Sequence, residues 1–409
     1  MAAVTSAAGL SRWMLGLMAC ACGMSIANIY YAQPLIGTIA PDIGLSPALS
    51  SFIVTLAQVG YCAGLILLVP LGDRFESRRV IVGTLALACL ALVLAAQAGS
   101  VLGFLTASLL IGIGSVVVQM IIPMATHLSS PALRGSVVGS ITSGLLAGIM
   151  LSRPMAGLIA STFGWRAVFI AAAVGMFVLA IVLMRRLPAH RVSASNSYFN
   201  LIGSLWPLLR DTPVLRRRAA YQAALFAAYS LFWTSMPLVL SGAPFGMSHG
   251  EVTLFALAAV TGTIAAPLAG RVADAGKAQL ATGIALSAAA IACLFAWLAR
   301  DGSIPLMIAS AVLLDIGVWS CLVLGQRAIS LLEPAVRSRL NALYTAIFFA
   351  GGAVGSACAS IALAAGGWQL SCLIAITFPL SALLLFTREA RAVRVRVVPT
   401  SDPLLTKGK

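Results

Sequence analysis

The sequence predicts an all-α membrane protein of twelve transmembrane helices, arranged as two parallel six-helix pseudo-repeats. Of its 409 residues, 60% are hydrophobic and only 9% are charged, and the mean hydropathy is +1.02. A water-soluble core cannot bury that much apolar surface. Apolar runs of about twenty residues recur along the chain, which is the length that an α-helix needs to cross a bilayer. Several short features also recur at one constant spacing, as duplicated halves would require.

The apolar runs, taken in chain order, define the helices and four regions. We expect an N-terminal six-helix bundle over 1–185, a cytoplasmic linker over 186–216, a C-terminal six-helix bundle over 217–388 and a basic cytoplasmic tail over 389–409. Two structures are possible for the linker. It is either a partly ordered segment or a helix in the membrane interface with Tyr198, Leu201 and Leu205 on one face. The expected spans are 12–38, 48–70, 79–97, 101–124, 136–161, 165–184, 217–240, 250–271, 278–299, 303–327, 338–364 and 367–387.

Four pairs of features carry the prediction of a repeat. The spacing that separates Pro34 from Pro237 also separates Gly148 from Gly351. The same spacing relates Gly164-Trp165 to Gly367-Trp368 and the loop 131–134 to the loop 334–337. Parallel halves are related by an axis along the membrane normal, so we expect the substrate path between them.

The formal charge of +15 indicates how the chain is oriented in the membrane, because the basic residues are unevenly distributed between its two sides. Most arginines fall in the loops on one side of the predicted membrane, whereas the opposite loops hold only Arg166 and Arg300. Under the positive-inside rule this imbalance predicts a bacterial-type inner (plasma) membrane protein with both termini cytoplasmic. The basic side then faces anionic lipid of the bilayer, and we expect no nucleic-acid partner. All eight cysteines fall inside predicted spans, without a disulfide or zinc pattern.

A basic motif joins the second and third predicted helices. It reads Leu71-Gly72-Asp73-Arg74-Phe75-Glu76-Ser77-Arg78-Arg79, and a degenerate copy with Asp274 occupies 270–277 in the second half. Together with the helix count, the half-repeat and the basic loops, it resembles the cytoplasmic signature of the major facilitator superfamily. The resemblance implies alternating access and a conformational latch formed by Asp73, Arg74, Arg78, Arg79 and Asp274. The alternative is a lipid-facing basic loop that acts only in topology.

The fifth predicted helix carries glycines and a proline. Gly144 and Gly148 are four residues apart, and Pro154 and Gly157 follow. Such glycines permit close backbone approach, and a helical proline leaves a carbonyl unpaired. The segment is similar to the antiporter signature of the drug/sugar efflux branch, and simple close packing is the alternative. We expect Gly351 and Gly355 to be contact glycines at the boundary between the halves.

Asp315 is the single carboxylate deep inside a predicted span. A charged aspartate near the bilayer centre costs about 2.5–3.5 kcal/mol, so we assign Asp315 to proton coupling, with Arg153 as its candidate partner. The alternative for Asp315 is a carboxylate held by donors without titrating. Arg153 has two other possible roles, binding an anionic substrate group and reaching toward the membrane surface.

Polar and aromatic residues recur on one face of helices that, by the same resemblance, line the superfamily's cavity. They suit an amphipathic organic molecule, and helix packing is the alternative for each of them. The predicted substrate-binding residues are Asn28, Tyr31, Gln33, Gln58, Tyr61, Ser115, Gln119, Gln222, Tyr229, Trp233, Trp319 and Gln326.

These features favour a secondary transporter and not an enzyme. The sequence has no phosphate-binding Gly-rich loop, its three histidines are scattered, and we expect no cofactor and no metal. The leading hypothesis is export of a drug-like or sugar-like solute by proton antiport, with the small-molecule substrate and protons as partners of a monomer. The alternatives are a proton-coupled uptake symporter for a small metabolite and a transporter-like sensor without flux.

Overall fold

The computed structural model describes residues 11–130, 133–188, 198–257, 261–332 and 336–397. Every regular element within these ranges is a helix. Nine of the described helices or helix runs are long and apolar enough to cross a membrane. The all-α fold is confirmed, whereas the count of twelve spans and the internal repeat stay predictions.

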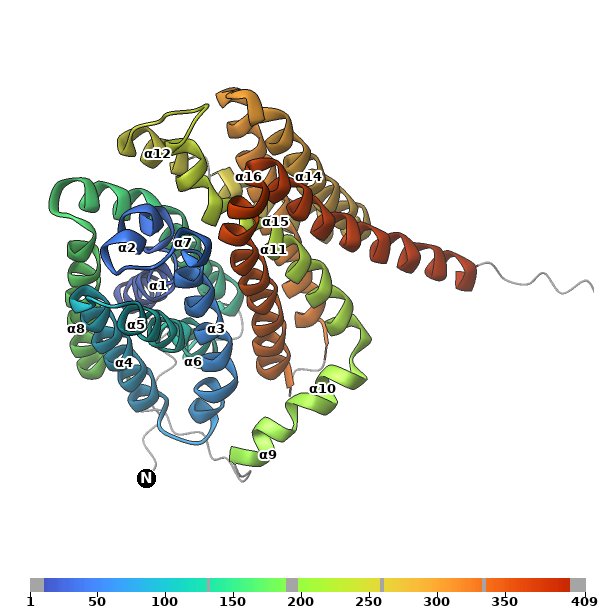
Figure 1. Ribbon diagram of the computed structural model, residues 1–409. Coiled ribbons are helices and arrows are strands. Elements are labelled where there is room, and N and C mark those ends of the chain that lie inside the picture. Colours follow the sequence, from blue (N-terminus) through green and yellow to red (C-terminus); the bar gives the residue numbers. More distant parts are fainter. Residues whose placement is uncertain (1–10, 131–132, 189–197, 258–260, 333–335, 398–409) are drawn as a thin grey trace, which may run out of the picture.

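The helices fall into two groups, which lie side by side in Figure 1. We call residues 12–186 the N-half and residues 213–397 the C-half. The N-half consists of α1 (Arg12–Ala27), η1 (Gln33–Leu35), α2 (Ile36–Asp42), η2 (Pro47–Leu49), α3 (Phe52–Leu67), η3 (Val69–Asp73), α4 (Ser77–Gln97), α5 (Val101–Gly114), η4 (Ser115–Val117), α6 (Val118–His127), α7 (Arg134–Phe163) and α8 (Trp165–Arg186).

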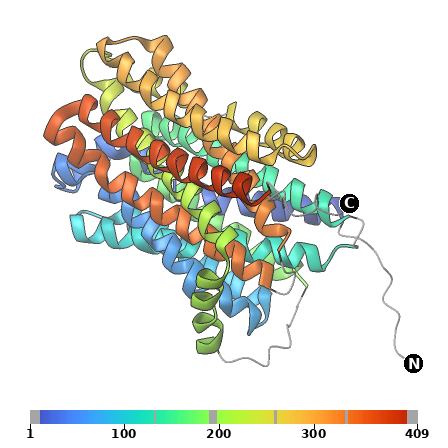
Figure 2. The same cartoon turned by 90° about the vertical axis from the view of Figure 1, so that its right-hand side faces the viewer.

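The C-half contains the longest helix, α16 (Arg337–Val397). Most of its helices run roughly alongside those of the N-half, as Figure 2 shows. It consists of α11 (Pro213–Ser241), α12 (His249–Phe255), α13 (Thr261–Asp274), α14 (Ala278–Leu298), η6 (Ala299–Asp301), α15 (Ile304–Ser330) and α16 (Arg337–Val397).

Several boundaries differ from the predicted ones, including those of the first helix and of the last part of the chain. The first expected helix is interrupted after Ala27, and Pro34 lies in the short 3-10 helix η1 that follows, where its missing N–H costs no α-helical hydrogen bond. The last two expected helices form α16, which has non-helical backbone at Gly366 and Gly367. The helix then continues to Val397, beyond the predicted start of the tail at 389.

Gly164 and Gly367 occupy similar positions. Both have positive φ, +81° and +63°, a conformation that residues with a Cβ rarely adopt. Each is followed by a tryptophan that begins the next helical segment. This likeness fits the predicted repeat. The loops 131–132 and 333–335, on which the repeat argument also relied, lie outside the described residues.

Glycines bring neighbouring helices into close contact inside each half. A Cβ at Gly148 would overlap the backbone of Gly23 on α1, and one at Gly60 would overlap the backbone of α5. The close approach predicted for the fifth helix is therefore present. The prediction that Gly351 and Gly355 lie at the boundary between the halves is wrong. They pack on Ala223 and Ala227 of α11, inside the C-half.

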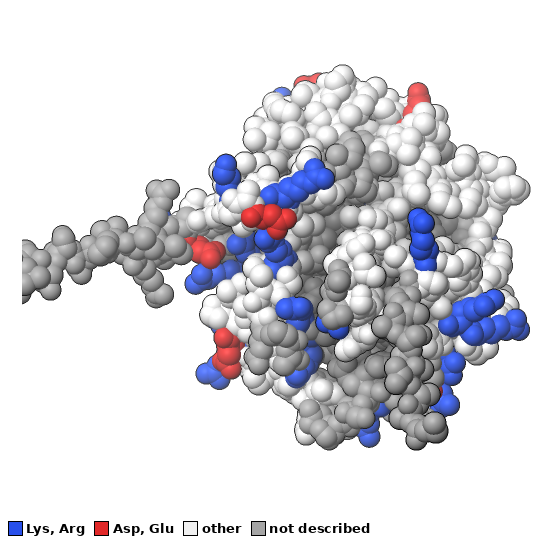
Figure 3. All heavy atoms as spheres, turned by 180° about the vertical axis from the view of Figure 1, so that it is seen from behind, with Lys and Arg blue, Asp and Glu red and all other residues white. Residues whose placement is uncertain are grey.

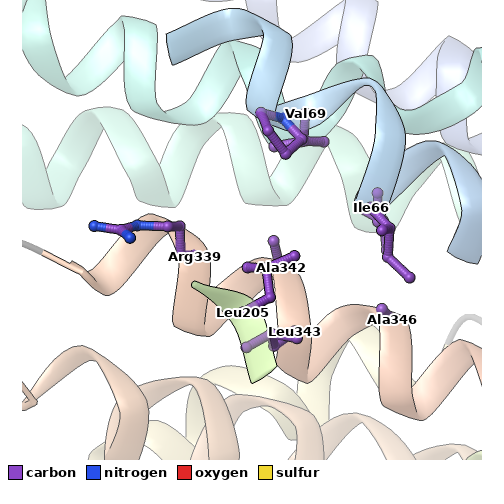
Figure 4. Close-up of a pocket in the computed structure, with 9 residues that line it drawn as sticks. Ile66, Val69, Leu205, Arg339, Ala342, Leu343 and Ala346 are labelled. Carbon is purple, nitrogen blue, oxygen red and sulfur yellow. The ribbon is translucent and has the colours of Figure 1, made fainter. Parts of the chain in front are cut away.

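The linker crosses one end of the molecule as two short helices, α9 (Tyr198–Gly203) and α10 (Leu205–Asp211). Tyr198 donates a hydrogen bond to the carbonyl of Leu67 in the N-half, and Arg339 of the C-half donates one to Ser204. Figure 4 shows Leu205 beside α16, with Ile66 and Val69 on the opposite side of a small pocket. The pocket has a volume of about 20 Å³. The linker thus contacts both halves, and we call this end of the molecule the linker end.

The opposite end, which we call the far end, carries the junction between α7 and α8. There Asp42 accepts hydrogen bonds from the Trp165 indole at 3.0 Å and from Arg166 at 2.5 Å. These bonds hold the pKa of Asp42 below its usual range. Much of the remaining surface is uncharged, and Figure 3 shows blue basic groups outnumbering red acidic groups on one face.

Candidate functional site

A cavity of about 600 Å³ lies between the two halves. Its walls come from α6 and α7 on one side and from α15 and the start of α16 on the other. Residues at helix termini of the linker end, including Arg134, Ser330 and Arg337, form its outer part. The cavity therefore opens toward the linker end, and its size suits a small organic molecule.

Gln119, Trp319 and Gln326 are the predicted substrate-binding residues that line this cavity. Asn341 of α16 donates a hydrogen bond to the Gln119 side chain at 3.1 Å, and so connects the C-half to the N-half across the cavity wall. Leu145, Leu146 and Leu322 supply apolar surface nearby. The lining thus combines amides, one indole ring and aliphatic walls.

The far end is closed by neutral side chains that pair across the two halves. Ser51 and Ser360 lie 2.7 Å apart, oxygen to oxygen, and Thr55 and Ser356 lie 2.9 Å apart. We call these pairs the hydroxyl seam. Because neutral hydrogen bonds contribute only about 0.5–1.5 kcal/mol net each, such a closure can open without separating buried charges.

Two glutamines extend the closure toward the centre of the molecule. Gln58 donates a hydrogen bond to Ser230 at 2.7 Å, and Gln33 donates one to Thr234 at 3.2 Å. All four side chains are buried. Both glutamines were predicted to bind substrate, and in this structure they join α3 and η1 of the N-half to α11 of the C-half.

Arg153 lies beside this closure, and only 2% of its surface is exposed. It donates hydrogen bonds of 2.9 Å to Gln33 and to the Tyr229 hydroxyl. Its guanidinium carbon lies 5.2 Å, 5.4 Å and 4.6 Å from the ring centres of Tyr30, Tyr229 and Trp233. A cation over several rings gains about 0.5–2 kcal/mol from each. Arg153 of α7 therefore joins the N-half to α11.

Asp315 is completely buried on α15. One carboxylate oxygen accepts a hydrogen bond of 3.0 Å from the Trp319 indole, while the other has no partner among the described residues. The ion pairs of the described residues do not include one between Asp315 and Arg153.

Tyr229 links these two charged side chains. Its hydroxyl accepts from Arg153, and its ring packs edge to face against Trp319 with centres 5.7 Å apart. Trp319 in turn donates to Asp315 and lines the cavity. A continuous path of contacts, which we call the Arg153–Asp315 path, therefore runs from the closed far end to the cavity.

The other predicted substrate residues lie in the packed interior. Ser115 donates to the carbonyl of Ile111 on its own chain segment, and Gln222 donates to the carbonyl of Val318. The Tyr61 ring lies 4.3 Å from that of Phe349, and Tyr31 packs at the edge of the apolar core. Asn28 is buried without a hydrogen-bond partner among the described residues.

The predicted latch residues contact their own halves in this conformation. Arg78 and Arg79 pair with Glu76, at 2.9 Å and 3.1 Å, and Arg74 lies near the Phe75 ring. Asp274 pairs with Arg327 inside the C-half. The side chain of Asp73 lies outside the described part of the structure. No described contact of these residues crosses to the opposite half.

The remaining residues of the fifth predicted helix serve two purposes. Pro154 directly follows Arg153 inside α7. A Cβ at Gly157 would overlap the Thr253 side chain of α12, so this glycine does face the C-half. Gly352, which sequence reasoning missed, also lies at this boundary because it contacts Gln58 and Phe226.

Sequence reasoning also missed several polar partners. Asn341 and the seam hydroxyls have no signal in a single sequence, because serine, threonine and asparagine occur at many positions of the predicted helices. Glu76 lies inside the basic motif and received no role from the sequence, although it is the buried acid that pairs with two arginines. Tyr30 could have been noticed beside Asn28 and Tyr31 on the first helix.

Comparison with known proteins agrees with this arrangement. The family model described as Major Facilitator Superfamily matches residues 15–281 and 219–406. The chain is 41% identical over 379 residues to the uncharacterized transporter YgaY of Escherichia coli O157:H7, covering 93% of this chain and 96% of that one. It is 33% identical over 366 residues to the probable transporter SCO4007 of Streptomyces coelicolor, covering 89% and 85%.

Several solved structures share the fold, including these two. One is a bacterial homolog of the human lysosomal transporter Spinster in an inward-facing, unoccupied conformation, with a TM-score of 0.70, 14% identity and coverage of 93% of this chain and 96% of that one. The other is a mutant of the nucleoside transporter NupG, with a TM-score of 0.72, 14% identity and coverage of 91% and 99%. The chain belongs to the major facilitator superfamily and is a membrane transporter of that type.

Proposed function

We propose that this transporter exports a small organic solute, drug-like or sugar-like, by proton antiport. The main observation behind this proposal is the Arg153–Asp315 path, which connects the cavity at the linker end to the closure at the far end. We infer from the positive-inside rule that the linker end is cytoplasmic, so that the cavity takes up solute from inside the cell. The structure then corresponds to the inward-open state of the cycle.

Asp315 is the proposed proton-coupling residue. Trp319 is a positioning residue, because solute bound in the cavity would contact its ring and so change its hydrogen bond to Asp315. A solute that moves the Trp319 ring removes the hydrogen bond that the Asp315 carboxyl group accepts from it. It also disturbs the Tyr229 ring and hence the bond between Tyr229 and Arg153. Cavity occupancy and the far-end closure thus act on the same side chains, which is the differential interaction that alternating access requires.

The glycine and proline pattern of α7 supports antiport. Gly148 fixes α7 against α1, while Gly157 contacts α12 across the far end. Arg153 and Pro154 lie between these two contacts. Because α7 packs on its own half at Gly148 and on the other half at Gly157, a movement of α7 would shift both the far-end closure and the buried Arg153.

Proteoliposomes with an imposed pH difference test the function. Compounds that raise the melting temperature of the detergent-purified protein are the substrates offered, and a trapped pH-sensitive dye reports proton movement. Antiport predicts solute movement opposite to the proton flow, and Asp315→Asn should abolish proton movement while solute exchange persists. Ser320→Ala, on the same helix, is the matched control.

Three outcomes would change the assignment. Solute that moves with the protons would support proton-coupled uptake instead. Binding without any flux would support a transporter-like sensor. Coupled flux that survives Asp315→Asn would remove this residue from the coupling role.

A further inference from the structure

The described lining of the cavity is basic. Arg134 at the start of α7 and Arg337 at the start of α16 face the space from opposite halves, and His127 lies at its edge. The described lining residues include no aspartate and no glutamate. Neither arginine forms an ion pair with a described carboxylate, in contrast to Arg78, Arg79 and Arg327 at the same end. Their charges therefore act on the cavity.

A third arginine, Arg153, lies deeper in the molecule, at the end of the Arg153–Asp315 path. Arg153 donates only to neutral partners, and its remaining guanidinium nitrogen, Nη1, is buried without a hydrogen-bond partner among the described residues. Asp315 is the negative counterpart, but Trp319 occupies one of its oxygens and it forms no ion pair with Arg153. A buried charged donor with a free N–H is poised to accept an anion.

The rest of the lining fits the body of such a molecule. Leu145, Leu146 and Ile122 offer apolar walls, and Trp319 offers a ring face for stacking. Gln119 and Gln326 supply neutral polar groups that tolerate hydroxyl or ether oxygens. The pattern matches one charged head on an aromatic or aliphatic body.

We propose that the substrates are small organic anions, such as aryl carboxylates, drawn in by Arg134 and Arg337. This substrate class deepens the proposed export function and rests on it. The two arginines act as an electrostatic entrance, because opposing cations concentrate anions in a low-dielectric cleft whose described lining holds no carboxylate. An exposed attraction of this kind weakens as added salt shortens the screening length.

Binding to the detergent-solubilised protein tests the class without needing transport. The probes are 2-naphthoate, its neutral amide 2-naphthamide and the cationic 2-naphthylmethylamine, which share one ring system. Tryptophan fluorescence gives the dissociation constants, because Trp319 lies in the cavity wall. We expect the anion to bind at least tenfold more tightly than the amide, the amine to bind most weakly, and the preference to shrink as salt rises.

Charge reversal supplies the decisive comparison. The double variant Arg134→Glu with Arg337→Glu should weaken 2-naphthoate binding at least tenfold and strengthen binding of the amine. The control, Arg185→Glu with Lys277→Glu, changes the net charge equally outside the cavity and should keep the wild-type preference. Equal binding of the three probes, or an equal effect of the control pair, would overturn the proposal.

The two proposals can fail separately. An anion preference without proton-coupled flux in proteoliposomes would refute the export function and keep the substrate class. Proton-coupled flux of the amide or the amine with no preference for the anion would refute the substrate class and keep the transport cycle.

Discussion

The far end of the molecule is closed, whereas the linker end is open to the cavity, and the two ends are built from different kinds of side chains. The far end is held by buried hydroxyl and amide pairs, with the buried Arg153 guanidinium beside them and a glycine contact at Gly157. The linker end carries most of the arginines and holds the cavity. Neutral contacts form and break at small free-energy differences, whereas charges need water or a partner when they are enclosed. From this difference we expect the seam to influence the conformational equilibrium and the basic end to influence which solutes enter.

The largest effect is expected inside one half, where no movement is required. Gly148→Leu places a side chain against the Gly23 backbone of α1, and overpacking of this kind typically costs about 1–3 kcal/mol or more. We expect a melting temperature lower by several degrees and a poor yield of folded protein. Gly139→Leu on the same helix, where nothing lies within 4 Å, is the control and should be tolerated.

Replacement of the buried cation is expected to slow transport next most strongly. Arg153→Lys keeps the charge but loses the planar group that bonds Gln33 and Tyr229 together, so it is not a conservative change. The loss of one charged hydrogen bond, about 1.5–3 kcal/mol, predicts a transport rate lower by tenfold or more. Arg166→Lys at the exposed far end should leave the rate nearly unchanged. Wild-type rates in Arg153→Lys would show that the path carries no coupling.

The hydroxyl seam should tune the equilibrium without harming the fold. Ser356→Ala combined with Ser360→Ala removes the cross-half hydrogen bonds that these two hydroxyls form with Thr55, Ser51 and the Ala48 carbonyl. At roughly 1 kcal/mol each, their loss corresponds to a shift of about tenfold or more toward the far-end-open state. Spin labels on α3 and α16 at the far end would report the longer distances. Ser161→Ala serves as the control, because Ser161 bonds only its own helix. An unchanged distance distribution would contradict the role assigned to the seam.

The smallest effect concerns the exposed pair of Asp42 and Arg166. The hydrogen bonds from Arg166 and Trp165 lower the pKa of Asp42, so the pair stabilises the fold above the unfolded-state value of about 4 and this contribution is lost as the pH falls through the lower folded-state pKa. Asp42→Asn should lower the melting temperature slightly at pH 7. The difference from wild type should vanish in strongly acidic buffer, and a constant difference at every pH would argue against the pair.

The sequence predicts the helical segments well because each is a continuous apolar run bounded by glycine, proline or charge. It also identifies Arg153 and Asp315, since charged residues are rare in such runs. It does not predict that Arg153 bonds Gln33 and Tyr229, which lie far from it in the chain, because those contacts depend on how the helices pack. Nor does it reveal that Gly351 packs inside its own half, since a glycine at one helix face has several possible neighbours.

Conformational state is likewise absent from the sequence. The same twelve predicted substrate residues lie partly in the cavity and partly in the closed interior, because one structure samples one arrangement of the halves. Gln119, Trp319 and Gln326 are reachable here, whereas Gln33, Gln58 and Trp233 are enclosed. In alternating access we expect the second set to become reachable when the far end opens.

The basic lining of the cavity has an electrical consequence. If a monovalent anion leaves the cell while a proton enters, both movements carry current of the same sign, and two elementary charges cross per cycle. Each is worth about 2.3 kcal/mol per 100 mV, so the voltage across the membrane would drive export even without a pH difference. Uptake of the same anion together with a proton would instead be electrically silent. A potassium-diffusion potential imposed with valinomycin therefore tells the two directions apart.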